Sequence, residues 1–500
     1  MAAARKFPTE PDILTALDEP PRTEWSEYND ADHLGASGVD VQDMTRMGKT
    51  QEFKRAFRPL AALSFSAVLQ ATWEFILMAP TSGGQYHWVS EFAGTNWQRF
   101  LSYTTGWMAV LAWQAGAASG SYLTGTILQG LISIRDPGYN PTRWQGTLFV
   151  VAMVALIYVF NVYASSWLPR IQNLLMLLHI VSWVIVLVVL VVLAPHRSAK
   201  SVFTEFQNGG GWPTLGVSLM IGQISAIYGS LSSDATAHMS EEVKDASRYV
   251  PIAILWGYIV NGILGLAIVI IYLFSIPSLS DALNDPSGFP FIYVFQNCVS
   301  TAGVNGLTSS ILIPVIFSNI LFNISTARQT YAFARDKGFP FGAWLARVDR
   351  KRKIPINAIA FSCLISVLLS LINIGSDTAF NAIISLNVAA LMSTYAVSIS
   401  CVLYTRIWHP SRLPEKRWSL GRFSVPVNVI GLCYVIFALF WSFWPPSPGF
   451  DASEFNWSVV IFVGVLIISL VMYAVHGRYH YAGPVEYVSR SSVNRLLLRD

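Results

Sequence analysis

Long apolar stretches without a charged residue follow one another along most of this 500-residue chain. No Asp, Glu, Lys or Arg occurs from Phe100 to Ile134, for example, or from Tyr249 to Ser280. A helix needs about 20 mainly apolar residues to cross a lipid bilayer, and these stretches reach that length. The pattern predicts eleven membrane-spanning helices, at residues 59–78, 101–133, 144–163, 171–194, 214–232, 250–276, 304–332, 355–374, 378–405, 425–445 and 455–476.

The basic residues around these stretches predict which side of the membrane each loop faces, because cytoplasmic loops carry an excess of Lys and Arg. Residues 1–58 and 328–353 contain eight each, and the C-terminal tail contains four, whereas 277–303 contains none. The stretch 286–300 is short and opens on Pro and Gly, so we expect an interfacial helix there. The predicted domains are a cytoplasmic polar tail at 1–58, disordered over much of its length, a transmembrane domain at 59–476 and a cytoplasmic tail at 477–500.

The number of spans and the charge pattern conflict. Two cytoplasmic ends require an even number of crossings, and eleven is odd. Counting forward from the N-terminus places residues 79–100 outside the cell, whereas counting backward from the C-terminus places them inside. Either a span is missing near residue 78, or the first apolar stretch does not cross, or the N-terminus lies outside despite its charges.

Composition supports a membrane protein and excludes several other classes. The chain is 53% hydrophobic and only 12% charged, whereas soluble proteins are about 25% charged. The net charge of +4 gives no reason to expect a nucleic-acid partner. The four cysteines lie far apart and form no CxxC pair, so we expect no metal site, no disulfide framework and no cofactor.

One polar segment, at residues 229–251, reads GSLSSDATAHMSEEVKDASRYVP. It resembles the signature of the fungal amino acid/choline transporter family, the GABA and choline permeases, within the amino acid–polyamine–organocation superfamily. The resemblance extends over residues 46–487 and includes APTSGGQYHWVSEFA (79–93) and STARQTYAFARDKGFP (325–340). The signature positions that match are Asp234, Ala235, His238, Glu241, Glu242, Val250 and Pro251.

The resemblance implies an all-α, polytopic membrane protein with two inverted five-helix repeats and broken helices near the bilayer midplane. A break frees backbone N–H and C=O groups for a substrate or ion. The candidate breaks are Gln70–Glu74 and Tyr228–Asp234. In the family a complete second span follows a Trp-Glu pair, whereas here Trp73-Glu74 is followed at once by FILMAPTSGGQYHW. Twelve spans are therefore implied, with the second missing here through a gene-model error, a splice variant or a real alteration.

The candidate breaks contain the first candidate site residues. An ionised carboxylate at membrane depth is costly unless it is paired or faces water, so Glu74 could attract an ammonium group or accept a coupling proton. Alternatively, it lies at the interface because its span is short. Trp73 could offer a cation–π face or anchor the helix at the lipid interface. The candidate substrate-binding residues are Trp73, Glu74, Tyr228, Gly229, Ser230 and Asp234.

Two further residues are candidates for proton coupling beside Glu74. Asp234 ends a charge-free run, and it could bind a proton or cation or act as the N-cap of the helix that follows. His179 lies within an apolar stretch, where it could take part in proton coupling or form a packing hydrogen bond. Asn319, Asn323 and Thr326 share one helix face and could line a substrate path or bond across helices.

The charged residues after the second break suggest a cytoplasmic gate. In this interpretation Glu241 or Glu242 binds Arg328 or Arg335 when the inward side is closed, with His238 as a titratable neighbour. Alternatively, His238 pairs with the two glutamates on a solvated helix end.

The sequence is compatible with three functions. The first is a secondary transporter in the plasma membrane or vacuole that moves an amino acid, GABA or choline, coupled to protons. The second is a membrane enzyme, for which His238 and Asp234 are the only candidate pair. The third is a non-transporting product that lacks the second span. The expected partners are a small amine-bearing solute, a proton and the lipid bilayer, and the sequence indicates no oligomeric state.

Overall fold

The structure is a computed structural model that describes residues 35–47, 49, 51–56, 81–136, 138–231, 234–375, 379–413, 421–449, 455–481, 483 and 484. The first predicted span, 59–78, lies outside the described residues, and so do Trp73 and Glu74. The described part is helical and contains no strand. This confirms the all-α, polytopic fold class.

Ten predicted spans fall within the described part, and each corresponds to a helix. Eight helices there are long and apolar enough to cross a membrane. The exceptions are the 16-residue α10 and the 38-residue α6, whose buried face is rich in small and polar residues. The helices are α6 (Gln98–Arg135), α7 (Arg143–Tyr163), α8 (Leu168–Leu193), α10 (Leu215–Ser230), α12 (Ala246–Ser275), α15 (Thr301–Arg335), α17 (Ile356–Ser370), α19 (Ala379–Trp408), α20 (Ser424–Trp441) and α21 (Ser458–Met472).

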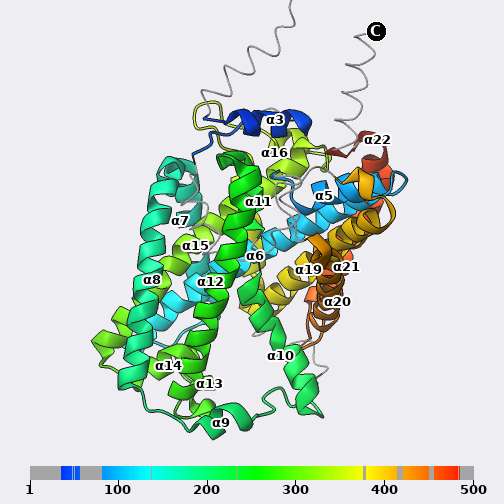
Figure 1. Cartoon of the computed structure of the whole chain (residues 1–500). Helices are drawn as coiled ribbons and strands as arrows, with labels where there is room; N and C mark the ends of the chain where they lie inside the picture. Colours follow the sequence, from blue (N-terminus) through cyan, green and yellow to red (C-terminus); the bar gives the residue numbers. More distant parts are fainter. Residues whose placement is uncertain are drawn as a thin grey trace, which may run out of the picture.

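Helix α6 runs obliquely through the middle of the bundle, and α15 and α19 pack against it (Figure 1). Glycines allow α15 to approach closely. A Cβ atom at Gly106 would lie 2.1 Å from the ring of Phe333, and one at Gly120 would lie 2.4 Å from Asn319 Oδ1. Lipid tails are as apolar as leucine side chains, so close van der Waals contact between helices supplies much of the association energy.

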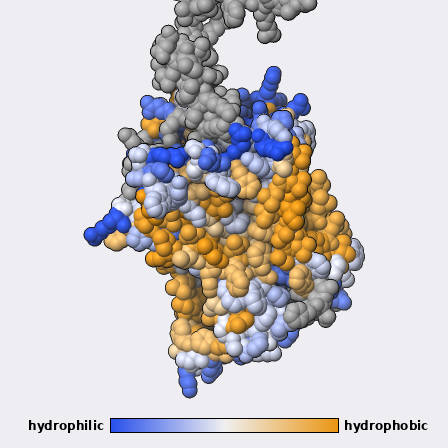
Figure 2. Space-filling view, turned by 90° about the vertical axis from the view of Figure 1, so that its right-hand side faces the viewer, coloured by the Kyte–Doolittle hydropathy of each residue, from blue (hydrophilic) through white to orange (hydrophobic). Residues whose placement is uncertain are grey.

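The bundle has two polar ends that are separated by an apolar belt (Figure 2). Helices α3 (Gly38–Arg46), α16 (Gly342–Leu345) and α22 (Arg478–His480) lie at one end. The short helices α9 (Ala199–Thr204), α13 (Leu279–Leu283) and α14 (Pro290–Gln296) lie at the other (Figure 1), and α14 falls within the predicted interfacial stretch. The α3 end carries the loop richest in basic residues, so we expect it to face the cytoplasm.

The described flanks of residues 57–80 lie at the same end of the bundle. Lys49 forms an ion pair with Asp336, and the backbone N–H of Ser82 donates to Glu241. A single crossing between these flanks would place them at opposite ends, and two crossings need about 40 residues. Residues 57–80 provide only about half of that number. The positions of these flanks agree with two of the alternatives drawn from the sequence, a missing span near residue 78 or a first apolar stretch that does not cross.

We expect glycosylation tags to report this arrangement. A tag inserted after Asn96, which is exposed beside α5 (Gln85–Phe92), should remain unmodified, because we expect this end of the bundle to face the cytoplasm. A tag after Gln207, exposed in the loop between α9 and α10, should be glycosylated. The mobility of each tagged chain before and after glycosidase treatment measures both. Modification after Asn96 would contradict the sidedness.

Candidate functional site

The chain is interrupted between α10 and α12, where the sequence predicts a broken helix. Helix α10 ends at Ser230, and it is followed by the four-residue α11 (Ala235–His238) and the 3-10 turn η2 (Ser240–Glu242). Helix α12 begins only at Ala246. The peptide groups from Asp234 to Asp245 therefore lie outside any long helix and need other hydrogen-bond partners.

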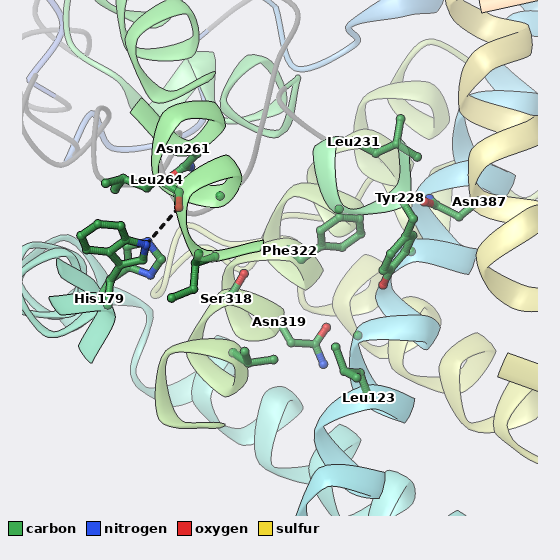
Figure 3. Close-up of a pocket in the computed structure, with 17 residues that line it drawn as sticks. Leu123, His179, Tyr228, Leu231, Asn261, Leu264, Ser318, Asn319, Phe322 and Asn387 are labelled. Carbon is green, nitrogen blue, oxygen red and sulfur yellow. Dashed lines mark hydrogen bonds between the residues drawn. The ribbon is translucent and has the colours of Figure 1, made fainter. Parts of the chain in front are cut away.

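A cavity of about 390 Å³ lies beside this interruption. It is bounded by α6, α8, α10, α12, α15 and α19, and Gly116 and Gly120 of α6 are among its lining residues. Figure 3 shows His179 near one end and Tyr228 near the other, with residues of α15 between them. The polar lining consists of His179, Trp183, Tyr228, Asn261, Ser318, Asn319 and Asn387.

The lining residues include no carboxylate, lysine or arginine among the described part of the chain. The Tyr228 hydroxyl shares a hydrogen bond with Ser119 at 2.8 Å, and the Trp183 indole donates to the carbonyl of Leu264 at 3.1 Å. The described wall of the cavity can therefore form neutral hydrogen bonds and aromatic contacts. It cannot neutralise a charged ligand with a fixed ion.

Asp234 lies outside this cavity, in a fully buried polar cluster. The Tyr395 hydroxyl donates to Asp234 Oδ1 at 2.8 Å, and Gln85 Nε2 donates to Oδ2. The His238 ring lies 3.4 Å from the same Oδ2. The Asp234 side chain forms no capping hydrogen bond with α11, so the N-cap alternative is wrong for its carboxylate.

His238 is held by contacts on three sides and is fully buried. Its Nδ1 lies 2.8 Å from the carbonyl oxygen of Ser82 and therefore carries the proton in that bond. The edge of the ring faces Trp113 at a centroid distance of 4.7 Å. The alternative in which His238 pairs with Glu241 and Glu242 is wrong, because both glutamates bind arginines.

The predicted gate residues form two ion pairs between the η2 turn and the end of α15. Arg335 donates two hydrogen bonds to Glu241, at 3.0 and 3.1 Å. Arg328 donates to Glu242 at 2.7 Å. Although burial opposes the ionised form, Arg335 lowers the pKa of Glu241 to about 2. Glu241 is fully buried, so the alternative of a solvated helix end is wrong.

The family comparison agrees with this geometry. A family model described as amino acid permease matches residues 60–467. This chain belongs to the amino acid permease family. Its relatives place the permease within the amino acid–polyamine–organocation superfamily that the 229–251 signature indicates.

Three relatives show the range of names in the family. A candidate amino acid/polyamine transporter of Macrophomina phaseolina is 28% identical over 396 residues, covering 78% of this permease and 87% of the relative. Amino-acid permease 2 of Neurospora crassa is 24% identical over 494 residues, covering 89% of each chain. The choline transporter of Saccharomyces cerevisiae is 25% identical over 402 residues, covering 80% of this permease and 70% of the relative.

The permease places only some of the candidate residues together. Tyr228, Gly229 and His179 line the same cavity. Ser230 lines a separate cavity of about 340 Å³ together with Tyr395. Asp234 lies beyond both. Each member of the trio on α15 bonds across helices: Asn319 to Ser121, Asn323 to Asn161 and Thr326 to the carbonyl of Trp113.

Sequence reasoning missed the partners of Asp234 and His238. Gln85 and Ser82 belong to the APTSGGQYHW motif, which supported the resemblance without any assigned role. Tyr395 lies in the middle of α19, where no sequence signal distinguishes it from a packing tyrosine. Among the described residues of the permease, no group of His, Cys, Asp and Glu could hold a metal ion.

We expect Glu241→Gln to destabilise the permease more than Glu242→Gln. Removing one partner of a buried ion pair leaves the other charge unpaired and costs about 3–5 kcal/mol. Each variant leaves an arginine unpaired, but Glu241 is fully buried and accepts three hydrogen bonds, two from Arg335 and one from the Ser82 backbone, whereas Glu242 is 12% exposed and accepts one from Arg328. Thermal unfolding of the purified variants in detergent measures the difference, and equal melting temperatures would contradict it.

The lowered pKa of Glu241 also predicts how stability depends on pH. Because the pKa falls from 4.5 to about 2 on folding, the ionised Glu241 carboxylate contributes fully to the free energy of unfolding above about pH 4.5. This contribution is lost as the pH falls toward 2.

Proposed function

We propose that this amino acid permease is a proton-coupled secondary transporter for a small amine-bearing solute, such as an amino acid, GABA or choline. The observation that carries the proposal is the cavity beside the interrupted helix. Transporters of this type bind their substrates where broken helices expose peptide groups at membrane depth. A cavity of this volume fits a small solute.

The neutral lining of the cavity supports a specific division of roles. Tyr228, Asn319 and Asn387 would contact the body and the polar groups of the substrate. The ammonium group then needs a carboxylate from elsewhere in the chain, and Glu74 is the proposed source. Trp73 would add a cation–π face beside it.

Asp234 is the proposed site of proton coupling in the described part. Its carboxylate is fully buried and accepts hydrogen bonds from Tyr395 and Gln85. It also lies within the segment that must rearrange if the two ion pairs of the η2 turn open. Protonation would change its contact with His238 Nε2, which lies 3.4 Å from Oδ2, so proton binding and opening would be linked. His179, which lines the cavity, is the second candidate.

Glu241, Glu242, Arg328 and Arg335 would act as the cytoplasmic gate in this proposal. Their two ion pairs join the interrupted segment to α15. The structure would then represent a state that is closed on the α3 side. Inward opening separates these pairs, and water replaces their contacts.

Uptake of radiolabelled amino acids, GABA and choline in cells that lack their own uptake systems tests this function. Uptake should saturate, and it should collapse when an uncoupler is added. Asp234→Asn and Glu74→Gln should each lower uptake at least about tenfold, because each removes a charged interaction of roughly 1.5–3 kcal/mol. Asp136→Asn, at an exposed loop position, is the matched control. Normal uptake by both site variants would contradict the assigned roles.

A second function is favoured by one specific observation, which is that the flanks of residues 57–80 lie at the same end of the bundle. We propose as the alternative that this chain is a non-transporting product that lacks the second span. A bundle without the second span would have four helices in its first repeat and five in its second. A membrane enzyme is less well supported, because His238 and Asp234 are fully buried and engaged by their neighbours.

The transcript across codons 73–80 distinguishes these two functions. If the gene encodes a full transporter, we expect an additional segment of roughly 20 apolar residues plus a connection. If the chain is complete in this region, a fluorescent fusion should remain in the endoplasmic reticulum and show no uptake. Surface expression with normal uptake of the present sequence would refute the non-transporting alternative.

A further inference from the structure

The N-terminal segment before the first apolar stretch is bound to the face that carries the gate. We call its described residues 37–47, 49 and 51–56 the strap. Helix α3 begins with a capping box, in which Ser37 and Asp40 exchange hydrogen bonds between their side chains and backbone N–H groups. This part of the polar tail is therefore ordered, although the sequence indicates a largely disordered tail.

One set of strap contacts holds the segment between η2 and the start of α12. The carboxylate of Asp40 accepts hydrogen bonds from the backbone N–H groups of Asp245 and Ala246, at 3.0 and 3.1 Å. It thereby caps a helix that begins far away in the sequence. Arg55 pairs with Asp40 at 3.1 Å and donates to the carbonyl oxygen of Ser240 at 3.1 Å.

A second set of contacts holds the end of α15. Lys49 pairs with Asp336 at 3.2 Å. The Phe53 ring meets the edge of Tyr331 at a centroid distance of 5.1 Å, and the Arg328 guanidinium lies 5.3 Å from the centre of the same Phe53 ring. The strap therefore touches a gate arginine directly.

A third contact reaches the gate carboxylate's own peptide group. Gln51 Nε2 donates to the backbone carbonyl oxygen of Glu241 at 2.8 Å, and Gln51 Oε1 accepts from Arg55 Nε at 3.1 Å. Gln51 thus links Arg55 of the strap to the turn that carries Glu241. The strap therefore contacts one partner of each gate ion pair, the peptide group of Glu241 and the guanidinium of Arg328.

The buried charges of the strap couple its release from the bundle to the separation of the η2 turn from α15. The side chains of Asp40 and Arg55 are only 1% and 2% exposed, and that of Lys49 is 7% exposed. Burial lowers the pKa of Lys49, which reflects the cost of a cation with little access to water. If the turn separated from α15, a strap that stayed on the turn would lose the Lys49–Asp336 ion pair, and a strap that stayed on α15 would leave the buried charges of Asp40 and Arg55 without their hydrogen bonds to Ser240, Asp245 and Ala246.

We propose that the strap is an autoinhibitory lock, which must leave the η2 turn or the end of α15 before the cytoplasmic side can open. The lock acts as a second layer over the two gate ion pairs. It concerns regulation of opening, so it does not depend on which solute is carried or on whether the chain transports at all.

A cysteine reporter beneath the strap tests the lock. Ser82 is fully buried, its backbone N–H binds Glu241, and its hydroxyl has no hydrogen-bond partner among the described residues. Ser82→Cys is therefore a mild change. The full-length chain carrying it is purified in detergent and reacted with a bulky, charged maleimide. The chain that retains Ser82 gives the background from the four natural cysteines.

Two variants loosen the strap from opposite sides. Lys49→Gln removes the ion pair with Asp336, and Gln51→Ala removes the bond to Glu241. Each should raise the labelling rate at position 82 about tenfold, which corresponds to a shift of about 1.4 kcal/mol in the closed-to-open equilibrium. Lys54→Gln is the matched control, because Lys54 is exposed on the same segment and loses the same charge. Its labelling rate should stay within about twofold of the parent.

The lock is refuted if both variants remain monodisperse and label no faster than Lys54→Gln. A second measurement needs no substitution. In the unaltered chain, the amides of Asp245 and Ala246 bind the strap carboxylate, so they should exchange with deuterium at the same rate as the α3 amides. Exchange of α3 that is more than about tenfold faster than exchange of these two amides would also overturn the proposal, because the strap would then open alone.

Discussion

A helix that is interrupted inside a packed bundle must find partners for the peptide groups it releases, because the surrounding side chains exclude water. In this permease the segment from Asp234 to Ala246 finds them in other elements. Ser325 of α15 donates to the carbonyl of Ala235, and Gln51 and Arg55 donate to carbonyls of the η2 turn. Asp40 accepts from the first N–H groups of α12. Contacts with α15 and the strap therefore satisfy part of this requirement.

The same requirement explains why so many ionisable groups are buried at one end of the bundle. Carboxylates and guanidinium groups form stronger hydrogen bonds with backbone groups than neutral side chains do. They also carry charges that must be neutralised when water is excluded. Glu241 shows both effects, since it accepts from the Ser82 backbone and from Arg335. Pairing in this region is therefore part of the fold, whatever further role the pairs have in opening.

Hydropathy predicted the spans in the described part because lipid imposes a length and an apolar composition on each helix. It also predicted α6, although this helix is less apolar, because its charge-free run is long. Residue types and spacing suggested that glutamates after the break would meet arginines of α15. The partners of Asp234 could not be predicted, because Gln85 and Tyr395 are 149 and 161 residues away in sequence. Such contacts depend on how whole helices cross, which no local pattern encodes.

The burial of polar groups along α6 has a consequence for how the protein is made. Helix α6 is absent from the eight helices that are apolar enough to be identified as spans, and it buries Gln114, Ser119 and Ser121 within the bundle. Among the described residues, Gln114 donates to Thr330 of α15 and Ser362 of α17, and both helices are synthesised long after α6 has left the ribosome. An early α6 in contact with lipid would expose an amide that costs free energy to desolvate. The hydrogen bonding of Gln114 is therefore completed only after the second half of the chain has been made.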